Sequence, residues 1–166
     1  MPQSRSEEEV LGIEPLMQAS KVIVAVVAHS LAEVGADVSI PQLRVLVMVA
    51  SHGPMNVSSL AQGLGVNPSN ASRTCDRMVA RGLLTRRADE RDRRHLVLEL
   101  SPEGQNLLDR ILDHRRSALR QVVRRMSASR RRRLQDGMTA FVSAAHEVSE
   151  AEGVGDGEGG LVHWLV

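Results

Sequence analysis

Apolar residues in the first third of the chain recur at intervals of three and four positions, a spacing that predicts amphipathic helices. In the first such segment the recurring positions are Leu16, Ser20, Ile23, Val24, Val27, Leu31 and Val34. Gly35 follows the last of them and is expected to end this helix. A second helix is predicted over IPQLRVLVMVASHG, because Ser39 and Gln42 match a capping box and Gly53 closes the pattern.

Two shorter helical patterns follow and are joined by a tight turn. Asn56 is suited to cap the segment VSSLAQGL. Asn67 and Pro68 are suited to start the segment SNASRTCDRMVARG, which ends at Gly82. Because the connection GVNP is short and contains a glycine, the pair matches a helix-turn-helix, with the second helix as the expected reading helix.

After residue 82 the pattern changes from helical spacing to alternation. The runs LLTRR and HLVLELS flank the charged segment ADERDRR, and Leu96, Leu98 and Leu100 alternate with polar or smaller neighbours. Alternation on both sides of a charged loop predicts a β-hairpin.

Two further helices are predicted after the hairpin. Ser101 and Pro102 start a pattern that runs to residue 126, and Ser127 or Ser129 caps a last helix that extends to about residue 148. The expected fold class is therefore mainly α with a small β-hairpin wing, which is a winged helix-turn-helix plus a helical dimerisation region. The first helix and the last two carry apolar stripes that one small domain cannot bury, so we expect a homodimer.

Composition narrows the class of protein. The chain has 166 residues, 42% of them hydrophobic, but only one Trp, one Phe and no Tyr, so its core must be aliphatic. The N-terminus is acidic rather than signal-like, and no apolar run approaches the roughly 18 residues of a membrane-spanning helix, so we expect a cytoplasmic protein with no membrane partner. A single cysteine, Cys75, excludes an internal disulfide.

The net charge of +1 is a sum of opposed blocks. Residues 67–94 carry eight Arg against four acids, and residues 110–133 carry ten Arg against one Asp. Acidic residues dominate both ends of the chain. Such asymmetry indicates basic surfaces for an anionic partner.

The reading helix has the residue types that a DNA major groove requires. Short polar side chains near its N-terminus suit base edges, and longer cations further along suit phosphates. The candidate contacts are Ser69, Asn70, Ser72, Arg73 and Arg77. The alternative is a merely solvated helix face. We expect Cys75, Met78 and Val79 to belong to the core.

The tip of the hairpin is a second candidate contact. Arg91 and Arg93 could reach across the backbone into the minor groove, where the negative potential is strongest. The alternative is a soluble turn in which the three arginines and three acids pair internally.

These motifs together resemble the MarR family of winged helix-turn-helix transcription factors, over about residues 15–148. The matching pieces are PQLRVL, VSSLAQGLGVNPSNASRTCDRMVARGLLTRR and DERDRRHLVLELSPEGQ. The resemblance implies that Asp92 and Arg94 pair to hold the shape of the wing, with Arg94 also among its DNA-binding arginines. It also implies a repressor that binds pseudo-palindromic operators in double-stranded DNA and is relieved by a small aromatic or anionic effector.

The expected organisation has four parts. These are an acidic N-terminal arm (1–14), a helical dimerisation region (15–36 and 102–150), a winged helix-turn-helix DNA-binding domain (37–101) and a Gly-rich C-terminal tail (151–166). We expect no enzyme activity, no cofactor and no metal, because the chain has no HExxH, CxxC or phosphate-binding Gly-rich loop.

Three alternatives stay open at this point. A winged helix can serve protein–protein interaction instead of DNA binding. Cys75 could make the regulator redox-responsive, and His29 or His114 with a carboxylate could make it metal-responsive.

The role of the Arg-rich block in residues 110–133 is also open. We prefer pairing with acids such as Glu147, Glu150 and Glu152, on the same chain or its dimer mate. A supplementary DNA contact and a simply hydrated surface are the other options.

Overall fold

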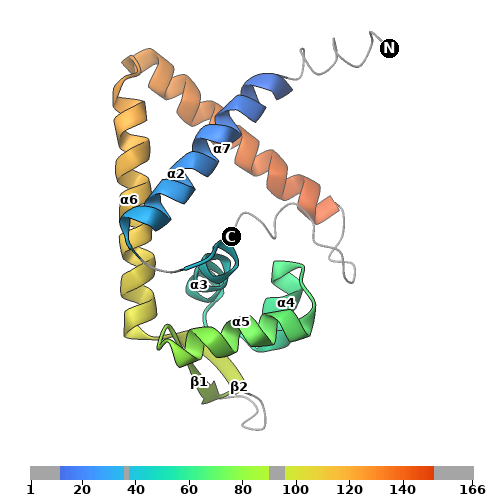
Figure 1. The fold of residues 1–166 in the computed structure, drawn as a ribbon. Coiled ribbons are helices and arrows are strands. Elements are labelled where there is room, and N and C mark those ends of the chain that lie inside the picture. Colours follow the sequence, from blue (N-terminus) through green and yellow to red (C-terminus); the bar gives the residue numbers. More distant parts are fainter. Residues whose placement is uncertain (1–11, 36–37, 90–95, 152–166) are drawn as a thin grey trace.

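A computed structural model describes residues 12–35, 38–89 and 96–151. Within them the order of elements is the expected one of four helices, two strands and two helices (Figure 1). The elements are α2 (Ile13–Glu33), α3 (Ile40–His52), α4 (Val57–Leu64), α5 (Pro68–Ala80), β1 (Leu84–Ala88), β2 (Leu96–Leu100), α6 (Pro102–Arg124) and α7 (Ala128–Ala151).

The helices begin where the sequence places capping residues. Ser39 and Gln42 form a full capping box, in which the Ser39 backbone amide donates to Gln42 Oε1 at 2.9 Å. The Asn56 side chain accepts from the Ser59 backbone amide at 2.8 Å, and Asn67 caps α5 in the same manner. At the start of α7 the Arg130 amide donates to Ser127 Oγ at 3.4 Å, which favours Ser127 over Ser129 as the cap.

The two strands form an antiparallel hairpin whose register runs from Leu84 opposite Leu100 to Ala88 opposite Leu96. Met55, just before α4, adds a third short segment by exchanging two backbone hydrogen bonds with Leu98. The alternation along β2 is less regular than the sequence suggests, because Val97 is buried while Leu96 is 60% exposed. Leu96 lies at the loop end of the strand, beyond the edge of the core.

One aliphatic core holds the helix-turn-helix, the hairpin and the start of α6 together. Its fully buried members come from every one of these elements and include Leu46, Leu60, Met78, Leu84, Leu98 and Ile111. Each such side chain contributes roughly 1.5–3 kcal/mol through removal of apolar surface from water. The core therefore fixes α5 and β1 relative to each other without any aromatic ring.

The other helices extend away from this core. In Figure 1, α6 rises from the hairpin, α2 crosses its middle, and α7 turns back from its far end. Apart from a half-buried Ala145, the described side chains of α7 are exposed in the single chain. Large apolar side chains are exposed on α2 and α7, among them Met17, Ile23, Val24, Leu134, Met138, Phe141 and Val148.

Helix α2 is more apolar than the sequence pattern alone indicated. By length and composition, its 21 residues are enough to cross a membrane. Only 6% of its apolar 18-residue stretch is buried within the single chain. The expectation that no segment meets this test was wrong. An apolar helix that packs against other helices of a soluble protein passes the same test.

Candidate nucleic-acid interface

The turn between α4 and α5 presents one face of α5 to the outside. Gly65 ends α4 with φ of 64°, in the left-handed region, and its amide donates back to carbonyls of the last turn. Asn67 then starts α5, so the two helices meet within three residues. Ala71, Cys75 and Met78 point into the core, and the opposite face of α5 is left for a partner.

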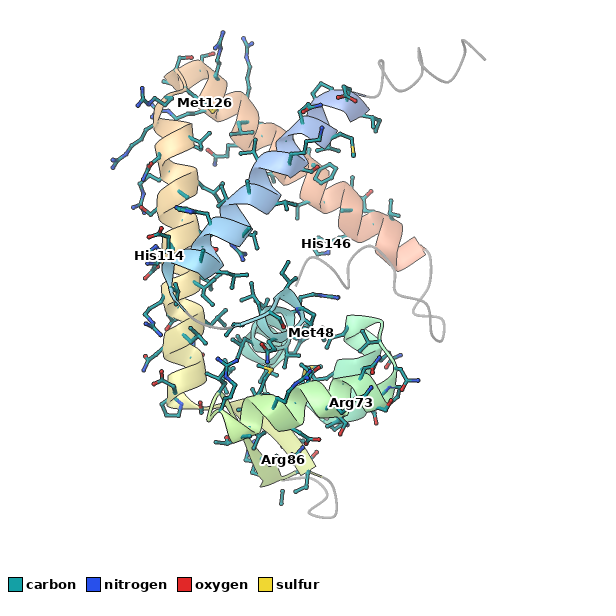
Figure 2. The ribbon with its side chains drawn as sticks, in the orientation of Figure 1. Met48, Arg73, Arg86, His114, Met126 and His146 are labelled. Atoms are coloured by element: carbon teal, nitrogen blue, oxygen red, sulfur yellow. The ribbon has the colours of Figure 1, made fainter. Side chains whose placement is uncertain are left out.

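The predicted reading residues lie on this outer face, with one partial exception. Ser69, Asn70, Arg73 and Arg77 are exposed, whereas Ser72 is half-buried. Arg73 donates from Nη2 to Asn70 Oδ1, one turn earlier, at 2.5 Å. The hydrogen bond holds the guanidinium beside the amide on the exposed face of α5. Figure 2 labels Arg73 on this helix.

Two residues that sequence reasoning did not assign to the site connect α5 with the hairpin. Asp76 forms an ion pair through Oδ1 with Arg86 Nη2 on β1, and Ser72 Oγ lies 3.5 Å from Asp76 Oδ2. The carboxylate therefore joins a predicted reading residue on one side and a strand of the hairpin on the other. The sequence did indicate the contact between Ser72 and Asp76, since residues four apart lie on the same helical face.

The hairpin is braced by a second ion pair. Arg87 Nε donates to Glu99 Oε2 at 2.7 Å across the strands, and Thr85 Oγ1 lies 3.4 Å from Glu99 Oε1. The predicted wing residues Arg91, Asp92, Arg93 and Arg94 lie outside the described residues. Their proposed contacts and the proposed Asp92–Arg94 pair remain predictions.

Cys75 lies at the centre of α5 and is fully buried. Burial raises the pKa of its thiol; the nearby Asp76 acts in the same direction, while Arg86 opposes them. A raised pKa keeps the sulfur protonated at neutral pH, whereas reactive cysteines are exposed and have lowered pKa values. The environment therefore argues against Cys75 as a redox sensor.

The candidate metal ligands are not clustered. His29 Nε2 lies 3.8 Å from Glu33 Oε1 on the exposed surface of α2. Within residues 12–35, 38–89 and 96–151 no three His, Cys, Asp or Glu side chains come together in a group that could hold a metal ion. His114 is likewise exposed, on α6.

One arginine on α6 differs from its neighbours. Arg115 falls in the apolar stripe of the helix, and its Nε is buried without a hydrogen-bond partner among the described residues. Burial lowers its pKa, although an arginine stays protonated at physiological pH. The same helix has exposed arginines at positions 110, 116, 120 and 124.

Comparison with known proteins agrees with this geometry. The model of the MarR family matches residues 38–96, which span α3 to the first residue of β2. The crystal structure of RV1404 from Mycobacterium tuberculosis is 37% identical, with a TM-score of 0.75 over 80% of this chain and 90% of that one.

Two curated proteins of Bacillus subtilis are also similar. The uncharacterized HTH-type transcriptional regulator YfiV is 27% identical over 116 residues, which are 70% of this chain and 72% of that protein. The HTH-type transcriptional repressor MdtR is 32% identical over 78 residues, or 47% of this chain and 50% of that protein.

Proposed function

This chain belongs to the MarR family of winged helix-turn-helix transcriptional regulators, and on that premise we propose that it is a dimeric repressor that binds a pseudo-palindromic operator in double-stranded DNA. The observation that carries the proposal is the outer face of α5. Asn70 and Arg73 are exposed there and hydrogen-bonded to each other, and the core holds the helix rigidly behind them. A rigid helix with such side chains suits direct readout in a major groove.

The hairpin supplies the second part of the proposed contact. We assign Arg91, Arg93 and Arg94 to the backbone and minor groove next to the segment that α5 reads, with Asp92 pairing with Arg94. Support comes from the position of the strands, because β1 packs beside α5 and the Asp76–Arg86 pair ties the two together. A wing held in this way would meet the DNA in a fixed relation to the reading helix.

Dimerisation is proposed through the apolar faces of α2, α6 and α7, which leaves their charged faces in solvent. The apolar side chains on α2 and α7 that a single chain leaves in solvent are the surface that a second copy would cover. A two-fold axis through this region would present two α5 helices to successive major grooves, about one helical turn apart.

We propose regulation by a small molecule because the chain belongs to the MarR family. A small aromatic or anionic effector bound between the dimer helices and the reading domain would change the spacing of the two α5 helices. The proposed location is the cytoplasm, and the proposed class is non-enzymatic, in keeping with the regulators to which the chain is similar.

The decisive experiment is binding of the purified protein to the DNA upstream of its own gene. A mobility shift at two salt concentrations, with random DNA as competitor, measures both preference and electrostatic contribution. We expect a specific complex containing two chains, weakened by salt. A protein that shows no preference for any genomic fragment over random DNA would instead fit a winged helix used for protein–protein interaction.

A further inference from the structure

A second basic surface lies at the junction of α6 and α7, which we call the basic elbow. It consists of exposed arginines in the last three turns of α6, at its C-cap and in the first two turns of α7, namely Arg116, Arg120, Arg124, Arg125, Arg130, Arg131, Arg132 and Arg133. Residues 114–133 contain no acidic residue at all. In Figure 2, Met126 marks this junction at the end of α6 opposite the hairpin and Arg86.

The arginines of the basic elbow are largely unneutralised within the described part of the chain. Arg116 pairs with Asp113 at 2.9 Å, whereas the other seven make no side-chain ion pair or hydrogen bond with a described residue. Glu147, which we expected to pair with this block, lies on α7 about 21 Å further along the helix axis than Arg133. Pairing of Glu147 with the basic elbow of the same chain is therefore excluded, and the side chains of Glu150 and Glu152 lie outside the description.

The placement of these charges is unfavourable unless a partner offsets it. Four consecutive arginines occupy the first two turns of α7, and the helix dipole disfavours the cations of the first turn, Arg130 and Arg131. Along α6, Arg116, Arg120 and Arg124 are spaced by four residues and repel one another along one face. An anionic ligand that spans both helices would remove both penalties.

We propose that the basic elbow binds the phosphate backbone of a second DNA duplex while α5 holds the operator. The inference rests on the proposed function for the first duplex. Since α6 has 23 residues and is about 35 Å long, the basic elbow and the exposed face of α5 lie near opposite ends of this helix. One straight duplex bound along α5 would therefore leave the basic elbow free for a second duplex.

The chemistry of the basic elbow favours nucleic acid over a protein partner. Protein interfaces depend on buried aromatic or apolar anchors. Among the described residues most exposed large apolar side chains lie on α2 and α7, and the basic elbow contributes two aliphatic ones, Val122 and Leu134, and no aromatic ring. Guanidinium groups bind phosphates in bidentate geometry and need no base contacts for sequence-independent binding. A regulator already held on DNA by α5 would meet neighbouring DNA at high effective concentration.

The test uses the full-length protein and two duplexes with different labels. The protein is first saturated with the duplex from upstream of its own gene, and a second duplex of random sequence is then added at low salt. The variant Arg124→Gln, Arg132→Gln, Arg133→Gln removes three charges from exposed positions. The matched control replaces the same residues by Lys and so keeps the charges.

We expect the wild type and the Lys variant to capture the second duplex, and the Gln variant to capture it at least about tenfold more weakly while binding the first duplex equally well. Equal capture by the Gln variant would overturn the proposal. So would binding of poly-glutamate by the wild type without capture of the second duplex.

Failure of the proposed function would be recognised separately, as loss of preference for the first duplex. In that case the salt dependence of binding to the random duplex alone still tests the basic elbow. The Gln variant should reduce the slope of log affinity against log salt by about 3 per engaged chain, and the Lys variant should leave it unchanged. An unchanged slope in the Gln variant would refute the site.

Discussion

Asp76 on α5 and Arg86 on β1 form an ion pair that joins the reading helix to the hairpin. Both side chains are partly exposed, at 51% and 38%, so the pair contributes little to folding, less than about 1 kcal/mol. Its proposed importance lies in geometry, since the same carboxylate also faces Ser72, one of the proposed reading residues. A contact that displaces the hairpin would therefore also displace Asp76 on α5.

Breaking this pair should weaken DNA binding more than stability. We expect Asp76→Asn to lower operator affinity about tenfold and to change the free energy of unfolding by less than about 1 kcal/mol. Arg86→Gln should act in the same direction, and a double-mutant cycle should show that the two effects are not additive. Additive losses of affinity would mean that the two residues act independently.

Arg73 should carry part of the sequence preference. Replacement by Ala removes both its own donors and its bond to Asn70, so discrimination between operator and random DNA should fall by about 1–3 kcal/mol. Competitive mobility shifts with both kinds of DNA measure the effect. Arg110→Ala, an exposed arginine on α6, is the matched control and should leave discrimination unchanged. Equal loss on both DNAs for Arg73→Ala would restrict its role to phosphate contact.

Gly104 is expected to be irreplaceable for packing reasons. A Cβ at this position would lie 2.0 Å from the backbone oxygen of Leu83, so Gly104→Ala must displace α6 from the reading unit and should destabilise the protein by about 3 kcal/mol or more. Gly137 on α7 has no atom within 4 Å of the corresponding position. Gly137→Ala should therefore stabilise the fold by up to about 1 kcal/mol, as urea denaturation would show.

Cys75 should make folding less favourable at alkaline pH. Its pKa is raised in the folded state by burial, so the unfolded chain loses the thiol proton first and stability falls as the pH rises above the ordinary value of 9.0. Cys75→Ala should remove this part of the decline, measured by denaturation between neutral and alkaline pH. The thiol of the native protein should also resist alkylation at neutral pH. Rapid alkylation of the folded chain would contradict its burial.

Phe141 provides a test of the dimer. It is 45% exposed at the centre of the apolar stripe of α7, where a charge would face the second copy. Phe141→Glu should convert the dimer to a monomer in sedimentation or light scattering. Ser143, on the opposite side of the same helix, is the control, and Ser143→Glu should remain dimeric. A dimeric Phe141→Glu protein would place the interface elsewhere.

Local rules of sequence predicted the helical parts of the fold well. The capping residues Ser39, Asn56, Asn67 and Ser101 act as N-caps as expected, because a cap depends only on side chains within one turn. The ends of α2 and α6 differ from the prediction by up to three residues, since packing decides how far the terminal turns continue.

Contacts between distant segments were harder to predict. The candidate reading residues Ser69, Asn70, Arg73 and Arg77 lie on one exposed face, which helical periodicity was sufficient to indicate. The partnership of Asp76 with Arg86 was missed because it depends on how β1 packs beside α5. Glu147 was expected to pair with the arginines of the same chain or of its dimer mate, and the same-chain form failed for a related reason. Charge balance along a sequence contains no information about distance along a helix.

The junction at Ser101 determines how motion could travel through the molecule. Its hydroxyl donates to the Gly82 carbonyl at 2.5 Å and accepts from the Gly104 amide at 2.9 Å, so the base of α6 is fastened to the loop that follows α5. A helix anchored at one end acts as a lever arm. Over a length of about 35 Å, a tilt of about 5° corresponds to a displacement of about 3 Å between its ends. A modest rearrangement among the dimer helices would thus be enlarged into a change in the separation of the two reading helices.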